Sequence, residues 1–127
     1  MRHPCQGPGP CPRCESAATL LPGGRLLLFG GATLASPRRL LSDVYCLDLG
    51  ASPPTWQQLQ PRQAGGDSGG TGGMVAVAGH AGAAMGELAV FVGGCRRLDR
   101  TEPEALVQVC AVGYGAFWWS QAWWLCC

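Results

Sequence analysis

An apolar strand that stops at two adjacent glycines occurs twice in this chain, and it limits the fold more than any other feature. The first copy is "GRLLLFGG", which ends at Gly30-Gly31, and the second is "LAVFVGG", which ends at Gly93-Gly94. From Gly30 to Gly93 the offset is 63 residues, and it also relates other pairs. These pairs are Gly23 and Gly86, Val44 and Val107, and Trp56 and Trp119. Because one offset relates all of them, the chain contains an internal repeat.

Turn and strand signals divide the first copy into four short strands. The apolar runs "SAATLL" and "RLLLF" flank a Pro-Gly-Gly turn, which favours a hairpin. The alternating segment "SDVYCLDL" follows the loop "ASPRR", and "TWQQLQ" follows the turn "GASPP". Four strands with a turn signal between each pair predict one blade of an antiparallel all-β fold.

The first copy resembles a kelch repeat, in which an apolar strand ends in Gly-Gly and is followed by a Tyr and then by a Trp. Here these residues are Gly30, Gly31, Tyr45 and Trp56, and "DVYCLDL" is similar to the third strand of the family. The second copy keeps part of this pattern but has Gln108 where Tyr45 would map. Its matching residues are His80, Gly93, Gly94 and Trp119. The resemblance covers roughly residues 12–119.

The resemblance implies a β-propeller, in which each repeat of about 50 residues forms one four-stranded blade. Even a four-bladed propeller needs about 200 residues, and this chain has 127. We therefore expect an all-β protein of one to two kelch-type blades, an incomplete propeller with open sheet faces. Such a chain is a fragment, a truncated isoform, or a piece that further blades or self-association complete.

The sequence predicts five regions. They are a proline- and glycine-rich lead-in (1–11), a first repeat (12–60), a glycine-rich loop (61–74), a degenerate second repeat (75–119) and a tail rich in Trp and Cys (120–127).

Composition and charge exclude several functions. The net charge of +1 gives no electrostatic case for binding nucleic acid. All nine basic residues are arginine, so a Walker-type phosphate loop and Schiff-base chemistry are both excluded. No secretory signal precedes the eight cysteines, which favours an intracellular, reducing compartment. Cys46 and Cys110 fall in predicted strands and are expected to be small core residues.

Two motifs suggest chemistry, and neither has the context that the chemistry needs. "GGDSGG" places Ser68 in a sequence like that around a hydrolase nucleophile, but the histidines are only His3, in the lead-in, and His80, at a repeat position. "CPRC" could hold zinc, but no second, well-separated ligand pair is present. Its candidate ligands are His3, Cys5, Cys11 and Cys14. We therefore expect no catalytic residue, no metal and no cofactor.

We expect a non-catalytic protein-interaction module, a kelch-type scaffold or substrate adaptor that binds a protein partner through the loops after each diglycine. Two alternatives remain open. One is a fragment of a propeller-type metal oxidase, which the resemblance allows. The other is a membrane-tethered protein, because residues 105–127 carry no charge, although their polar residues disfavour a membrane span. The candidate binding residues are Arg38, Arg39, Arg96, Arg97 and Arg100.

Overall fold

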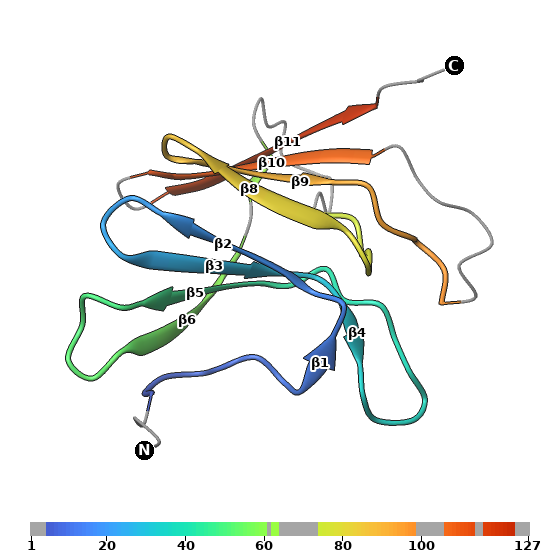
Figure 1. Cartoon of the computed structure of the whole chain (residues 1–127), viewed down its shortest axis with the longest axis horizontal. Helices are drawn as coiled ribbons and strands as arrows, with labels where there is room; N and C mark the ends of the chain where they lie inside the picture. The colour runs from blue at the N-terminus through green and yellow to red at the C-terminus, as the bar shows by residue number, and fades with distance from the viewer. Residues whose placement is uncertain (1–4, 61, 64–73, 99–105, 114–115, 124–127) are drawn as a thin grey trace.

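The computed structural model describes residues 5–60, 62–63, 74–98, 106–113 and 116–123. In these ranges every regular element is a β-strand, and the strands form two larger sheets that lie one over the other (Figure 1). The sheets are open and do not close into a propeller. The expected fold class, an all-β pair of incomplete propeller blades, is confirmed. The division into five regions stays a prediction.

The first sheet is the antiparallel blade that the turn signals predict. Leu27 lies opposite both Thr19 and Cys46 in the ladder, so side chains of alternate residues project from each face of the sheet. The spatial order follows the chain: β2 (Ala17–Leu21), β3 (Arg25–Phe29), β5 (Val44–Asp48) and β6 (Thr55–Leu59). A separate two-stranded ladder pairs β1 (Arg13–Cys14) with β4 (Ala32–Thr33).

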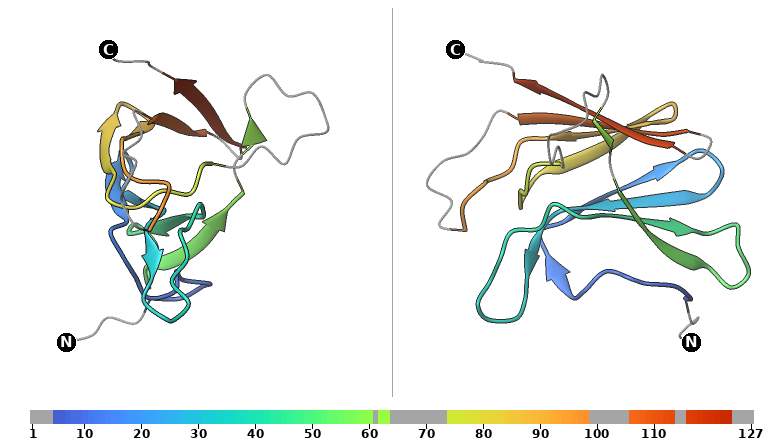
Figure 2. Two further views of the ribbon diagram at one scale, coloured as in Figure 1. Left: turned by 90° about the vertical axis from the view of Figure 1, so that its right-hand side faces the viewer. Right: turned by 180° about the vertical axis from the view of Figure 1, so that it is seen from behind.

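The second sheet repeats this order and adds one strand at its edge. Four antiparallel strands are followed at the outer edge by β7, which runs parallel to β11 (Figure 2). β7 lies in the segment expected to be a loop, and β11 continues past the expected end of the repeat at Trp119. The bounds are β8 (Ala81–Met85), β9 (Leu88–Val92), β10 (Leu106–Gly113), β11 (Ala116–Trp123) and β7 (Arg62–Gln63).

In both sheets the chain that precedes the repeat pairs with the outer strand. Gln6 forms a parallel bridge with Thr55 on β6, and Arg62 pairs in parallel with Trp118 on β11. Thr55 and Trp118 are separated by the same offset of 63 residues as the diglycines. Each blade therefore has its open outer edge covered in the same way, which is one means of protecting an edge strand.

The core lies between the two sheets, whose inner strands β2 and β8 contact each other. Phe29 and Phe91 are fully buried there, with ring centroids 4.9 Å apart. Further out, Met74 and Val77 fill the space between the sheets. The core is therefore an interface between two blades rather than the interior of a single sheet sandwich.

At the first diglycine, the backbones of the two repeats are in direct contact. Gly30 and Gly31 both have positive φ, 67° and 94°. The amide of Gly31 donates to the carbonyl of Val77 at 2.8 Å, and a Cβ at Gly30 would lie only 2.8 Å from that same carbonyl oxygen. Glycine is needed here for both its backbone freedom and its lack of a side chain.

Candidate functional site

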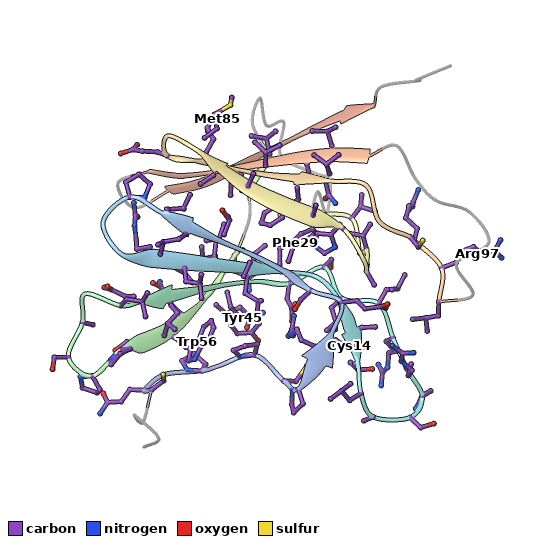
Figure 3. All side chains as sticks on the ribbon, viewed as in Figure 1. Cys14, Phe29, Tyr45, Trp56, Met85 and Arg97 are labelled. Atoms are coloured by element: carbon purple, nitrogen blue, oxygen red, sulfur yellow. The ribbon has the colours of Figure 1, made fainter. Side chains whose placement is uncertain are left out.

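Two loops that are far apart in the sequence converge at one end of the molecule. The first follows β4 and carries Arg38 and Arg39, and the second follows the diglycine after β9 and carries Arg96 and Arg97 (Figure 3). Both loops line one shallow, open depression of about 610 Å³. The depression is lined by Arg39, Leu40, Arg96, Arg97 and Leu98. Four of the five arginines expected from sequence are thus placed on neighbouring loops; Arg100 lies outside the described residues.

Backbone pairing at its base holds the first loop. Ala32 and Leu40 form an antiparallel bridge, and the amide of Leu41 donates to the carbonyl of Gly31 at 2.8 Å. The amide of Arg39 donates to Thr33 Oγ1 at 3.0 Å. The sequence forms a loop here because a short ladder is followed by "LASPR", which contains turn-forming residues.

Arg38 lies at the edge of this surface. Its Nη2 contacts Cys14 Sγ at 3.0 Å, and its Nε donates to the carbonyl of Thr33 at 3.4 Å. Arg38 also lines a small neighbouring cavity of about 20 Å³, together with residues from both loops. The lining residues of this cavity are Glu15, Arg38, Leu40, Ala78, Cys95, Arg97 and Leu98.

The charge pattern of the sequence identified the arginines but not the two leucines that line the depression. Leu98 is 42% exposed and Leu40 is half-buried, and both lie in the depression between the arginines. The missed signal is the triplet Arg-Arg-Leu, which occurs at 38–40 and again at 96–98. We call these six residues the arginine–leucine surface. Guanidinium groups around apolar side chains suit a ligand that presents carboxylates beside an apolar group.

Arg13, which is not one of the five candidate binding arginines, has a structural role. Its guanidinium makes a bidentate ion pair with Asp43, with Nη2–Oδ2 at 3.0 Å, and lies 5.4 Å from the centre of the Tyr45 ring. Burial lowers the pKa of Arg13, but the hydrogen bond to Asp43 and its charge outweigh burial and raise the pKa overall. These contacts join β1 to the start of β5 in the first sheet.

Tyr45 and Trp56, which carry the family resemblance, pack against each other and the lead-in. Their rings meet edge to face at 6.4 Å, and Gly9 lies against the Trp56 ring. Trp119 pairs through its backbone with Cys110 and Gln63. Gly93 and Gly94 have positive φ, like the first diglycine.

His80 lies in the interface between the blades. It is 8% exposed, its Nε2 donates to the carbonyl of Phe29 at 3.1 Å, and its ring packs edge-on against Phe29 and Phe91. Its buried Nδ1 has no hydrogen-bond partner among the residues that the structure describes. Burial lowers the pKa of His80, against the opposing effect of the Phe29 carbonyl. The geometry gives His80 a packing role between two sheets.

The other motifs acquire no site geometry in the described part of the chain. Among those residues, no three His, Cys, Asp or Glu side chains are grouped to hold a metal ion. His3 and Ser68 lie outside the described residues. The six described cysteines are all free thiols. Cys46 and Cys110 are in the core as expected, where burial raises the pKa of Cys46, and that of Cys110 to about 12.

No helix in the described ranges is long and apolar enough to cross a membrane. The uncharged C-terminal segment contributes the paired strands β10 and β11 instead.

Fold and repeat together define a pair of open, propeller-type blades, and local similarity to known proteins gives this kelch-type assignment loose support. The chain is 43% identical over 53 residues to Adagio-like protein 1 and to putative adagio-like protein 2, both from Oryza sativa subsp. japonica. The matched stretch is 42% of this chain but only 8% of the length of each relative. No family model matches the chain.

Proposed function

We propose that this chain is a non-catalytic protein-interaction module, which binds a protein partner through the arginine–leucine surface. The observation that supports this is that Arg39 and Leu40 of one Arg-Arg-Leu triplet and all three residues of the other, Arg96–Leu98, line one open depression. Loops held by a rigid sheet are a common place for binding residues. The local similarity to the Adagio-like proteins supports a kelch-type interaction role at a general level.

Charge selects the class of partner segment. Three of the five residues that line the depression are arginines, Arg39, Arg96 and Arg97. An acidic segment with one apolar side chain would place carboxylates on the guanidiniums and the apolar group between Leu40 and Leu98. Because these arginines are exposed, each such ion pair contributes about 0.2–1 kcal/mol.

The proposal is tested with one charge-reversed variant and one matched control. Arg39→Glu combined with Arg96→Glu reverses the charge of the arginine–leucine surface. Arg25→Glu, at the start of β3, also replaces an arginine by glutamate, but at a position outside the lining of the depression. Tagged wild-type and variant chains are used to capture partners, and each partner is then purified and titrated against the three proteins. We expect at least a tenfold loss of affinity for the double variant, about 1.4 kcal/mol, and less than twofold for Arg25→Glu.

A partner that binds the double variant as tightly as the wild type would refute the role of this surface. We also propose that the two blades act within a larger set of blades, and that the chain arises as a truncated isoform or fragment. Transcripts that show one uninterrupted exon pattern shared with a full-length propeller would refute the truncated-isoform hypothesis.

A further inference from the structure

The chain already contains one complete interface between two blades. One half is the face of the first sheet that points toward the second sheet, which we call a forward face. The other half is the face of the second sheet that points back toward the first sheet, which we call a rear face. The forward face consists of Leu27, Phe29, Val44 and Cys46, and the rear face of Ala89, Phe91, Gln108 and Cys110. None of these eight side chains is more than 7% exposed. Close packing of a forward face on a rear face is therefore how these sheets associate.

Each sheet also has a second face, which the repeat relates to this interface. Adding 63 to the residue numbers of the buried forward face of the first sheet gives the residues of the outer face of the second sheet. The same offset relates the buried rear face to the outer face of the first sheet. The outer forward face is Val90, Val92, Val107 and Val109, and the outer rear face is Leu26, Leu28, Tyr45 and Leu47.

The outer faces are apolar and, apart from Leu47, incompletely buried. Val92, which corresponds to the fully buried Phe29, is 49% exposed, and its cross-strand neighbour Val107 is partly exposed. On the first sheet, Leu20 is 57% exposed and lies opposite Leu26 on the same face. Exposed apolar faces of this kind mark association surfaces.

On each sheet, a residue near the start of the repeat contacts the rear face. On the second sheet, the amide of Val75 donates to Gln108 Oε1 at 2.7 Å, and Gln108 Nε2 donates to the Val75 carbonyl at 3.2 Å. On the first sheet, the position that corresponds to Gln108 is Tyr45, which lies under the Arg13 guanidinium. The outer rear face is thus built like the one that already receives a forward face.

We propose that the occupant of these faces is a second copy of this chain. The forward face of the second sheet of one copy packs on the rear face of the first sheet of the next, and continues the interface found within each chain. This contact is head to tail, so it leaves one face of each kind free, and a repeated rotation closes it into a ring. Closed propellers have about four to eight blades, which corresponds to about two to four copies.

Light scattering coupled to size-exclusion chromatography, over a range of concentrations, tests the proposal on the full chain. Val92→Asp places a charge on the forward face and Leu20→Asp on the rear face, both at exposed positions that the fold should tolerate. Leu49→Asp, at a position that is 47% exposed in a turn, is the control. We expect the wild type and the control to form assemblies of two or more 13.3 kDa chains. Each face variant should be monomeric, with its dissociation constant raised by about a hundredfold or more.

Mixing the two face variants tests the orientation of the contact. Each variant keeps one intact face, so an equimolar mixture should form a 1:1 dimer that neither variant forms alone. Circular dichroism of each variant confirms that its strand content is retained. A monomeric wild type would overturn the proposal and leave these faces for blades of another protein. A symmetric contact between forward faces would also overturn it, because Leu20→Asp would then dimerise alone. Neither result depends on partner binding at the arginine–leucine surface.

Discussion

Replacing Gly30 by alanine is expected to destabilise the protein more than the same replacement at Gly23. Both glycines have positive φ, 67° at Gly30 and 84° at Gly23, so both substitutions carry the backbone cost of a left-handed conformation. Their surroundings differ. A Cβ at Gly23 meets nothing within 4 Å, whereas a Cβ at Gly30 lies 2.8 Å from both the Val77 carbonyl oxygen and His80 Cε1.

The magnitude is the sum of two effects. The left-handed conformation costs an L-residue about 1–2 kcal/mol, which is the whole expected effect at Gly23. At Gly30 the added methyl group must also displace the Val77 backbone. Overpacking of this kind costs about 1–3 kcal/mol more. We therefore expect a loss of about 2–5 kcal/mol for Gly30→Ala and about 1–2 kcal/mol for Gly23→Ala.

Urea denaturation of both variants and the wild type, at one protein concentration, measures the difference. The concentration is held constant because association of the native state would change the apparent stability. Equal losses of unfolding free energy in the two variants would refute the reasoning, since the diglycine would then be a requirement of backbone conformation alone. A larger loss at Gly30 would show that close contact between the repeats requires a glycine there.

Three further predictions concern buried polar groups. Because burial lowers the pKa of His80, the unfolded state binds more protons; stability is therefore retained above about pH 6.5 and falls below it. Melting temperatures from pH 5 to 8 should show this slope, and His80→Phe should remove it. Gln108→Met keeps the volume but leaves the Val75 amide and carbonyl unpaired, which should cost about 2–4 kcal/mol in a urea titration. Asp43→Asn weakens the pair with Arg13 and should cost about 1–3 kcal/mol; no loss would show that the pair is dispensable.

Much of the fold follows from local sequence signals. The four strands of the first blade lie where the turn residues and apolar runs predict them, because a Pro-Gly-Gly turn and alternating side chains act within a few residues. In the second blade, the repeat predicts β9, which ends at the second diglycine, and the part of β10 that begins at Val107. β7 could not be predicted, because a two-residue strand has no periodicity and exists only through its pairing with β11.

Gln108 differs from the tyrosine that the repeat pattern predicts at its position, but it still has a structural role in the sheet. A glutamine in place of a tyrosine in the repeat weakens the sequence pattern. In the structure Gln108 is 1% exposed and pairs with the backbone of Val75, so it joins β10 to the start of the second repeat. Its two hydrogen bonds reach across 33 residues, which no local pattern can show.

The candidate site could be predicted in part. Charge and loop position identify Arg38, Arg39, Arg96 and Arg97 as candidates. They do not show that Arg39 shares a depression with Arg96 and Arg97, or that Leu40 and Leu98 line it as well. The two loops are brought together by the packing of one sheet on the other, in which Phe29 contacts Phe91. These two residues are 62 positions apart in the sequence, so no local pattern shows that contact.

The sequence by itself determined the repeat, its strands, and the small number of blades, because these depend on residue spacing and chain length. Only the tertiary structure decided which faces are buried. An alternating strand offers two apolar faces, and the choice between them depends on which sheet lies opposite. Packing between the sheets buries one face of each and leaves Val92 and Leu20 exposed on the others. That asymmetry is the physical basis for the proposed head-to-tail assembly.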